Sequence, residues 1–347
     1  MSVLAEGAAE VARAAGFDAA RLDAYLRGAV PGLAGPLSLA RIGGGQSNPT
    51  FFAEYGTRSL VLRKQPPGEL LPSAHAIDRE YRVLTALAAT DVPVPRTVLY
   101  ETGRDVVGTP FYLMEKLDGR VYAQHALPGV APAGRAAMYA SMADTLAKLH
   151  RVDPASVGLA DYGRPGNYFA RQVARWSKQW EASRTRANPW LDRMIEWLPK
   201  HIPDGDEVAI CHGDYRIGNL MFGPVEPRVI AVLDWELSTL GHPLADLGFN
   251  AMAWHTRPDE YGGLAGLDLV ALGIPTLDQH VARYLASAAR RGGIEPFHVA
   301  FALFRFAVIF EGIAARAAAG NAASDDAGVA GELGPAFARH ATELIGA

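Results

Sequence analysis

Two apolar runs frame a polar loop in Ile210-Cys211-His212-Gly213-Asp214-Tyr215-Arg216-Ile217-Gly218-Asn219-Leu220, and after a turn the chain continues as Val229-Ile230-Ala231-Val232-Leu233-Asp234-Trp235-Glu236. The second run is typical of a short buried strand, and it ends abruptly in two acidic residues. Acidic side chains at the end of a strand usually face a cleft. We therefore expect most of the chemistry of this chain to lie between residues 210 and 236.

Four polar residues in this segment have a specific spacing. His212 lies two residues before Asp214, Asn219 follows Asp214 by five residues, and Asp234 follows Asn219 by fifteen. Kinase catalytic loops and their magnesium-binding Asp share this spacing. Phosphoryl transfer needs a carboxylate that orients the acceptor hydroxyl and takes its proton, and it needs oxygen ligands for magnesium. Asp214, Asn219 and Asp234 are therefore the predicted catalytic residues, and Asn219 and Asp234 are the predicted metal ligands.

The segment departs from protein kinases at two places. Gly213 stands where they carry Arg, and Asp234-Trp235-Glu236 stands where they carry Asp-Phe-Gly. His-Gly-Asp followed by Asp-Trp-Glu resembles the aminoglycoside phosphotransferase family of small-molecule kinases. The resemblance covers residues near 37 to 260. The Arg-Glu-Tyr-Arg-Val-Leu stretch at 79–84 and the Asp-Trp-Glu-Leu-Ser-Thr-Leu-Gly stretch at 234–241 look most like the kinase-like domain ahead of acyl-CoA dehydrogenases in some larger enzymes.

The composition is that of an ordinary globular protein. Its 347 residues are 49% hydrophobic, which is enough for two lobes with buried cores. The net charge of -4 and the pI near 6.2 give no electrostatic reason to expect nucleic acid or a membrane as a partner. Cys211 is the only cysteine, which excludes an internal disulfide and disfavours structural zinc. The N-terminus lacks a signal-peptide pattern, so we expect a cytoplasmic protein.

The first third of the chain predicts leading helices and then a small sheet. Turn-bounded apolar runs predict strands at 37–42, 50–55, 59–65, 94–100 and 109–115, and helical spacing predicts a helix over 73–87. A glycine-rich tip between the first two strands contains Gly44, Gly45 and Ser47. Backbone N–H groups at such a tip can approach phosphate oxygens, although an ordinary hairpin has the same pattern. Gly-Gly-x-Ser-Asn resembles the family's nucleotide loop, which implies that these three residues bind phosphate.

A cation and a carboxylate are expected to pair beside the nucleotide. Leu60-Val61-Leu62-Arg63 aligns with the kinase pattern Val-Ala-Ile-Lys, so Arg63 is the predicted phosphate-binding cation. Lys64 should point to the opposite face of the strand. Glu80 falls on the apolar stripe of the next helix, where a carboxylate needs a partner such as Arg63. The alternatives are a solvated basic pair at the strand end and a Glu at the edge of the stripe.

The last strand of the sheet is expected to run into a hinge. By resemblance to the family, the Glu115 carbonyl and the Leu117 N–H would hydrogen-bond the purine, with Met114 at the back of its pocket. Main-chain contacts leave almost no signature in the sequence. A core strand without a ligand is therefore the alternative.

The remainder of the chain predicts a mainly helical lobe, in which 136–150 is a central helix that ends at His150. We expect His150 to complement the helix dipole, and we expect His212 and Asp246 to support the catalytic loop. Residues 164–193 carry six Arg and one Lys against two acids, so 7 − 2 gives +5. This charge would attract an anionic acceptor, and a solvated basic face is the alternative. The candidate acceptor residues are Arg171, Arg175, Lys178 and Glu236. The apolar segment 299–319 contains charges, so it predicts a buried helix.

The resemblance implies an α+β, bilobal protein-kinase-like fold, with residues 1–115 as a nucleotide-binding lobe and 116–347 as a helical lobe. The first lobe would hold a five-stranded antiparallel sheet and one helix. It also implies an ATP- or GTP-dependent, magnesium-dependent phosphotransferase that acts on a small-molecule hydroxyl, with a hydroxyacyl-CoA or an aminoglycoside as alternative acceptors. Two other classes stay open: a nucleotide-binding module without activity, and a metallohydrolase with His212, Asp214, Asp234, His242 and Asp246 as ligands. The oligomeric state is left open.

Overall fold

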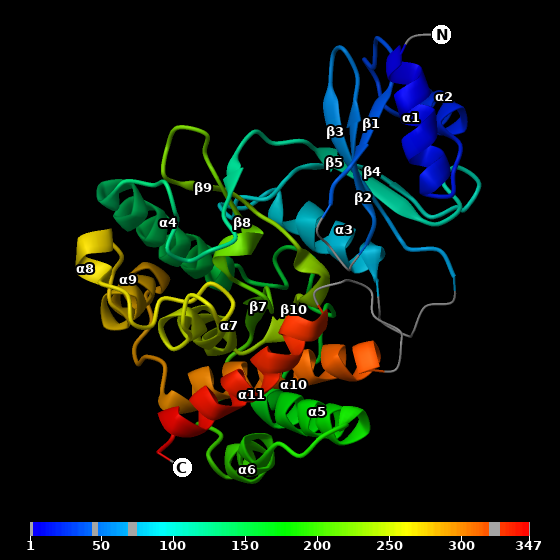
Figure 1. The fold of residues 1–347 in the computed structure, drawn as a ribbon. Coiled ribbons are helices and arrows are strands. Elements are labelled where there is room, and N and C mark those ends of the chain that lie inside the picture. The colour runs from blue at the N-terminus through cyan, green and yellow to red at the C-terminus, as the bar shows by residue number, and fades with distance from the viewer. Residues whose placement is uncertain (1–2, 44–47, 69–74, 319–326, 347) are drawn as a thin grey trace. The chain divides into compact units, whose positions relative to one another are not determined.

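A computed structural model describes residues 3–43, 48–68, 75–318 and 327–346 (Figure 1). Gly44, Gly45 and Ser47, the predicted phosphate-binding residues of the glycine-rich tip, lie outside these ranges. The chain divides into two compact units. The first comprises Met1–Asp118 together with Leu233–Glu236, and the second comprises Gly119–Val232 and Leu237–Ala347.

The first unit is built on a five-stranded antiparallel sheet, as predicted. Its strand order is β1-β2-β3-β5-β4. The strands are β1 (Ser38–Arg41), β2 (Thr50–Glu54), β3 (Ser59–Lys64), β4 (Thr97–Glu101) and β5 (Phe111–Glu115). The unit also contains helices α1 (Val3–Ala14), α2 (Ala19–Ala29) and α3 (Ile77–Leu87). Its apolar core includes Leu26, Phe51, Leu62 and Leu113.

Alternation along β3 places its two basic residues on different sides of the sheet, as predicted. Lys64 is 2% exposed, and its Nζ donates to the Val107 carbonyl at 2.7 Å. Burial lowers the pKa of Lys64. Arg63 has the opposite environment, because its guanidinium meets Glu80 from α3. Lys64 is thus a buried structural cation, and Arg63 is the cation that can serve a site.

The second unit is mainly helical. Its helices are α4 (Pro132–Arg151), α5 (Tyr168–Ser183), α6 (Pro189–Trp197), α7 (Pro243–Ala251), α8 (Leu269–Leu272), α9 (Leu277–Ala288), α10 (Pro296–Ala318) and α11 (Ala327–Leu344), with short 3-10 turns η1 (Leu198–Lys200), η2 (Ile217–Asn219) and η4 (Met252–Trp254). Short strands form two small antiparallel sheets: β6 (Arg120–Val121), β8 (Leu220–Phe222) and β9 (Val229–Val232) pair in one, and β7 (Ala209–Cys211) and β10 (Thr239–Gly241) pair in the other.

Helix α10 is the buried helix expected from the apolar segment. It carries one stretch, Pro296–Ala317, that is long and apolar enough to cross a membrane, and 83% of the apolar window in that stretch is buried inside the structure. Its aromatic side chains pack on α11, where Phe310 and Phe337 stack with their ring centroids 5.5 Å apart. Burial of this degree is what a core helix shows.

The segment Leu233–Glu236 belongs to the first unit, although the sequence assigned it to the helical lobe. It follows β9 directly along the chain and contains the turn η3 (Trp235–Leu237). The reason is electrostatic, because Arg63 of β3 pairs with Asp234 at 2.9 Å and lies 3.8 Å from Glu236. A strand-end cation thus holds a segment that is distant in sequence.

Candidate active site

The catalytic loop leaves β7 and turns sharply at Gly213. This glycine has a φ of +82°, and a Cβ there would lie 2.5 Å from the Leu237 carbonyl oxygen. A larger residue therefore meets both a left-handed backbone and a steric clash. This explains why His-Gly-Asp takes the place of His-Arg-Asp in this chain. The turn then presents Asp214 to the start of η2.

Asp214 lies in a small polar cluster made by its own loop. Asn219 Nδ2 donates to Asp214 Oδ2 at 2.7 Å and to the Asp214 carbonyl at 2.9 Å, and Arg216 Nε lies 3.4 Å from Oδ2. Burial raises the pKa of Asp214, while the Arg216 guanidinium and His212 oppose that rise. A carboxylate with a raised pKa, held by hydrogen bonds, has the properties of a general base. Asn219 uses its Nδ2 here, which leaves its Oδ1 to bind a cation.

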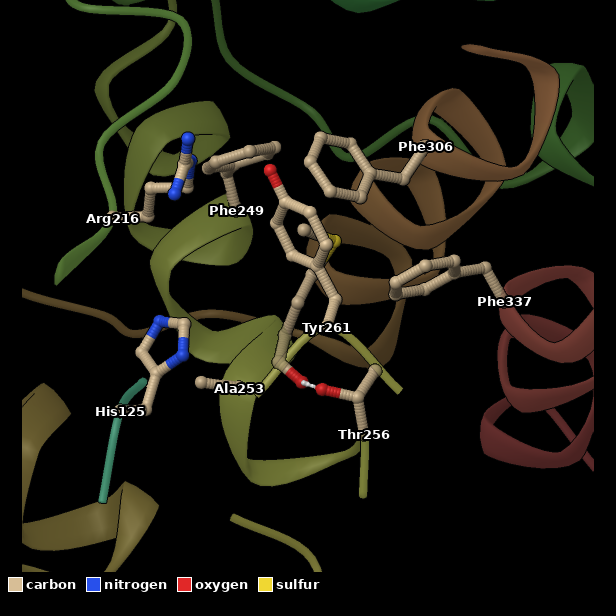
Figure 2. A pocket seen from close by; sticks show the side chains of 9 residues that line it. His125, Arg216, Phe249, Ala253, Thr256, Tyr261, Phe306 and Phe337 are labelled. Atoms are coloured by element: carbon tan, nitrogen blue, oxygen red, sulfur yellow. Dashed lines mark hydrogen bonds between the residues drawn. The ribbon is translucent and has the colours of Figure 1, made fainter. Parts of the chain in front are cut away.

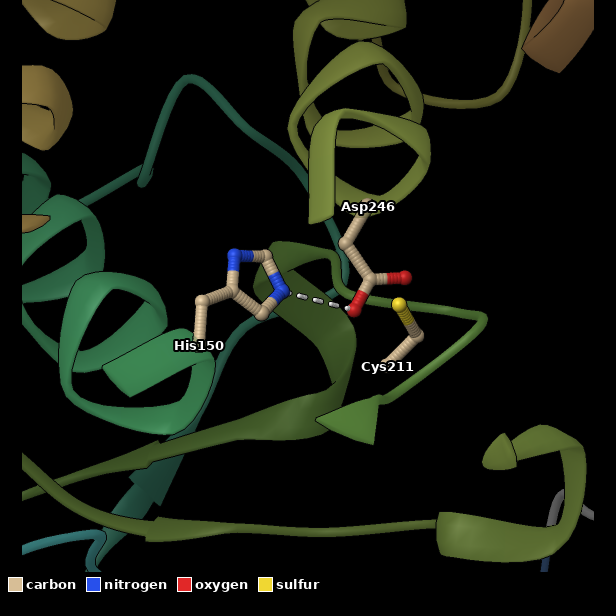
Figure 3. A group of neighbouring side chains, drawn as sticks. All are labelled: His150, Cys211 and Asp246. Atoms are coloured by element: carbon tan, nitrogen blue, oxygen red, sulfur yellow. Dashed lines mark hydrogen bonds and ion pairs between the residues drawn. The ribbon is translucent and has the colours of Figure 1, made fainter. Parts of the chain in front are cut away.

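Asp246 braces the backbone of the loop from α7. Its two carboxylate oxygens accept hydrogen bonds from the His212 N–H at 2.6 Å and the Gly213 N–H at 2.9 Å. His150 Nε2 lies 3.3 Å from the same carboxylate (Figure 3), and His150 Nδ1 lies 2.7 Å from the Tyr284 hydroxyl of α9. These are the contacts that the predicted supporting role of Asp246 requires.

His150 does not fit the expected helix-dipole role. Both of its ring nitrogens have partners, and burial lowers the pKa of this imidazole, so it is neutral near pH 7. A neutral ring carries no charge to complement the C-terminal end of α4. The sequence placed His150 correctly in the last turn of the helix. It missed that the turn faces Asp246 and Tyr284 in the interior.

His150, Cys211 and Asp246 form a buried group whose ligand atoms lie within 4.8 Å of one another (Figure 3). The hydrogen bonds above already use both nitrogens of His150 and both oxygens of Asp246. Burial also raises the pKa of the Cys211 thiol well above its usual value, which disfavours the thiolate that binds metals. The group fits a structural role better than a metal site.

The first unit contributes an ion-pair cluster centred on Arg63. The predicted partner Glu80 is present, with Arg63 Nε 2.7 Å from Glu80 Oε2, and Tyr112 and Asn48 donate to the same carboxylate at 3.0 and 2.7 Å. Burial raises the pKa of Glu80, and Arg63 opposes the rise. Burial alone would lower the pKa of Arg63, but Glu80, Tyr112 and Asp234 raise it. The Arg63 guanidinium therefore stays charged, and these contacts hold both side chains in place.

Asp234 has an unusual backbone conformation. Its φ is +63°, in the left-handed region that L residues other than Asn and Asp seldom adopt. Strained residues of this kind cluster at functional sites. Its carboxylate oxygen Oδ1 faces Arg63 Nη2 at 2.9 Å. Glu236, predicted for the acceptor, also approaches Arg63, so its carboxylate serves this cluster.

The predicted hinge residues follow in order at the end of the sheet. Met114 and Glu115 are the last two residues of β5, and Leu117 lies two residues after Glu115. Glu115 pairs with Leu60 across the ladder, and its N–H donates to the Arg96 carbonyl at 2.9 Å. The nucleotide contacts assigned to these three residues stay a prediction.

Several arginines of the basic segment 164–193 are already paired within the protein, so fewer of them can bind a ligand than the +5 charge implied. Arg184 pairs with Asp192 and Arg186 pairs with Glu311, both at 2.9 Å. On α5, Arg171 donates to the Arg164 and Pro165 carbonyls, whereas Arg175 and Lys178 are exposed. Two of the candidate acceptor residues thus remain open to solvent.

Sequence reasoning missed Arg216 and the aromatic pocket next to it (Figure 2). The Arg216 guanidinium lies 5.3 Å from the centroid of the Tyr261 ring, and it lines a small cavity of about 20 Å³. The other lining residues are His125, Phe249, Met252, Ala253, Thr256, Tyr261, Phe306 and Phe337. The pocket gathers residues from five separate parts of the sequence. Only Arg216, at two residues from Asp214, had a local signal.

Comparisons with known proteins agree with this geometry. A model of the phosphotransferase enzyme family, APH, matches residues 38–285. Acyl-CoA dehydrogenase family member 10 of Mus musculus is 41% identical over 332 residues, which are 93% of this chain and 31% of that protein. The chain therefore spans about a third of that relative.

Solved structures share the fold. One from Ralstonia eutropha JMP134, described as a candidate aminoglycoside phosphotransferase, is 46% identical with a TM-score of 0.86, covering 94% of this chain and 98% of that one. A ternary complex of aminoglycoside phosphotransferase APH(4)-Ia with AMP-PNP and hygromycin B is 15% identical with a TM-score of 0.59, covering 92% of this chain and 98% of that one. At 15% identity, the second match supports only a shared fold.

Proposed function

We propose that this chain, which belongs to the phosphotransferase enzyme family, moves the γ-phosphate of ATP to a hydroxyl group of a small molecule. The observation that carries the proposal is Asp214, a carboxylate with a raised pKa that Asn219 and Arg216 hold in one orientation. A family member that had lost activity would have no reason to keep this cluster. ATP is proposed because a solved member of the fold binds AMP-PNP.

Each residue has a role in the proposed reaction. Asp214 orients the acceptor hydroxyl and takes its proton as the oxygen attacks the γ-phosphorus. Arg63, held by Glu80, binds the nucleotide phosphates. Asn219 Oδ1 and the Asp234 carboxylate are hard oxygen ligands that fit magnesium, which would neutralise charge on the transferred phosphoryl group. Asp246 fixes the loop that carries Asp214.

For the acceptor we propose a hydroxyacyl-CoA or another anionic alcohol. Two observations support it: the similarity to an acyl-CoA dehydrogenase family member and the exposed cations Arg175 and Lys178 on α5. The second candidate is an aminoglycoside, for which the Ralstonia eutropha structure speaks. A polycationic sugar needs a wall of carboxylates, which these exposed cations do not provide.

A panel assay tests the acceptor. Purified chain is incubated with magnesium and ATP or GTP, together with hydroxyacyl-CoAs, their free hydroxy acids, kanamycin and hygromycin B. We expect phosphorylated product from the anionic members and none from the aminoglycosides. Phosphorylation of the aminoglycosides alone would overturn the proposed acceptor class while retaining the kinase reaction.

A metallohydrolase is a second function that the same residues could be proposed to carry, and their contacts support it less well. His212 Nδ1 accepts the Asp214 N–H, and His242 Nδ1 accepts the Leu244 N–H at the start of α7. Asp246 is occupied by the backbone of the loop. The imidazole and carboxylate groups that a metallohydrolase would need are therefore used as local hydrogen-bond acceptors.

A further inference from the structure

Arg305 on α10 is a buried cation with no counter-ion among the residues that the structure describes. It is 8% exposed, and its Nε is enclosed without a hydrogen-bond partner. Among residues 3–43, 48–68, 75–318 and 327–346, no carboxylate forms a salt bridge with its guanidinium. Buried arginines usually pair with acids, as the largely buried Arg63 does with Glu80. Arg305 is thus an exception that needs an explanation.

Aromatic rings surround the guanidinium. Its Cζ lies 5.5 Å from the ring centroid of Trp176 on α5 and 5.5 Å from that of Phe249 on α7. Such cation–π contacts offset part of the desolvation cost, yet they satisfy none of the N–H groups. The arrangement holds the guanidinium in place and leaves its hydrogen-bonding capacity unused.

Trp176 supplies a second unused donor at the same place. Its indole Nε1 is buried without a hydrogen-bond partner. Tryptophan can only donate at this atom, and arginine can only donate at its nitrogens. Arg305 is buried and Trp176 is partly buried, and among the described residues neither Arg305 Nε nor Trp176 Nε1 has an acceptor, which an oxygen anion would offer. The exposed Arg175, with its Cζ 5.4 Å from the Trp176 ring, adds positive charge nearby.

Arg305 and Trp176 lie close to residues that contact the catalytic loop. Phe249, which contacts Arg305, also lines the aromatic pocket in Figure 2 together with Arg216. Phe306, the next residue along α10, lines the same pocket. The Arg305 charge also reaches Asp214, where it joins Arg216 and His212 in opposing the rise in pKa that burial causes.

We propose that Arg305 and Trp176 bind an oxyanion, a carboxylate or phosphate group, carried by the phosphate acceptor. The inference rests on the proposed function, because it assigns the anionic end of the acceptor whose hydroxyl Asp214 would deprotonate. It makes Arg305 a residue that determines acceptor specificity.

Direct binding tests the site without relying on turnover. Acetate and inorganic phosphate are titrated separately by calorimetry into the full chain saturated with AMP-PNP and magnesium, and the two probes distinguish a carboxylate site from a phosphate site. Wild type should bind at least one probe, and Arg305→Gln should weaken that binding roughly tenfold or more. Arg193→Gln, an exposed arginine on α6, is the matched control and should bind like wild type. Equal binding by wild type and Arg305→Gln, or none by wild type, would overturn the proposal.

A folding control and a kinetic readout complete the test. Arg305→Met should melt no lower than wild type, because it removes an unpaired buried charge. In the transfer assay, Arg305→Gln should raise KM for an anionic acceptor and leave KM for ATP unchanged. If Arg305→Gln loses anion binding but wild type shows no transferase activity, the anion site is retained and the kinase reaction is rejected. Normal transfer with an unchanged acceptor KM would reject the site and retain the reaction.

Discussion

At the scale of single residues, Asp214 combines a functional requirement with a cost in stability. Its pKa in the folded state is raised, so the native protein binds the proton more tightly than the unfolded chain does. Stability from this group is therefore lost as the pH rises above the unfolded pKa. A buried carboxylate that must ionise for catalysis opposes folding at neutral pH.

The variant Asp214→Asn separates these two effects. It should lower kcat by roughly 10²–10⁴-fold because it removes the base. It should also raise the free energy of unfolding by about 1 kcal/mol, because a neutral amide costs less to bury. Steady-state kinetics and thermal melts measure both. A variant that is less stable than wild type, or that retains full kcat, would contradict the role assigned to Asp214.

The raised pKa of Asp214 also predicts the pH profile. The value of kcat/KM should fall on the acid side as the base becomes protonated, with a midpoint above the ordinary aspartate pKa of 3.8. A profile measured with a non-titrating acceptor reports this limb directly. If the midpoint lies at or below the ordinary value, burial does not control this carboxylate.

The Arg63–Glu80 pair predicts an effect on the nucleotide. Glu80→Gln keeps an oxygen that can accept from Tyr112 and Asn48 but removes the charge that holds Arg63. We expect KM for ATP to rise roughly tenfold and stability to fall by about 3 kcal/mol, since the partner charge stays buried. Glu226→Gln, which breaks the exposed pair with Arg228, is the matched control and should change neither quantity. Unaltered ATP binding in Glu80→Gln would limit the pair to a structural role.

At the scale of elements, the catalytic loop depends on support from two helices. The pKa of Asp246 is lowered: burial opposes this, but the hydrogen bond from His150 and the loop N–H groups outweigh it. A depressed carboxylate contributes stability that is complete above its unfolded pKa and is lost as the pH falls through the folded pKa. Acid should therefore loosen the loop as the pH falls through the folded pKa of Asp246.

Tyr284→Phe tests this support from α9. It removes the hydroxyl that bonds His150 Nδ1 and should cost about 1 kcal/mol of stability, with a smaller loss in kcat than Asp214→Asn. Asp246→Ala should cost considerably more because it leaves two buried backbone N–H groups unsatisfied. Denaturant unfolding compares the two. A larger cost for Tyr284→Phe would show that the hydroxyl, and not the carboxylate, carries the support.

The elements themselves were largely predictable. Alternation and turn residues predicted all five strands of the first sheet, because one face of that sheet is buried and period two is a strong local signal. Glu80 was found because a carboxylate on an apolar stripe is unusual. The left-handed φ of Asp234 and the membership of Leu233–Glu236 in the first unit were not predictable, since neither has a local pattern in the sequence and the Arg63–Asp234 contact joins residues 171 positions apart.

At the scale of the whole molecule, the family and fold predicted from the catalytic loop are confirmed. The acceptor site was not readable in the same way. Arg216, Arg305 and Trp176 come from separate segments, and only the folded chain shows that Arg305 has no carboxylate partner among the described residues. The charge of the basic segment 164–193 predicted an anionic ligand, whereas the residues proposed to bind it were found from the packing.

The most direct test of the central claim is transfer of a phosphoryl group to a hydroxyl. Wild type and Asp214→Asn are incubated with magnesium, γ-labelled ATP and the anionic acceptor panel, and labelled product is quantified together with nucleotide binding. We expect labelled product from wild type, almost none from Asp214→Asn, and equal nucleotide binding by both. Equal transfer by both proteins, or nucleotide binding without transfer to any hydroxyl, would contradict it.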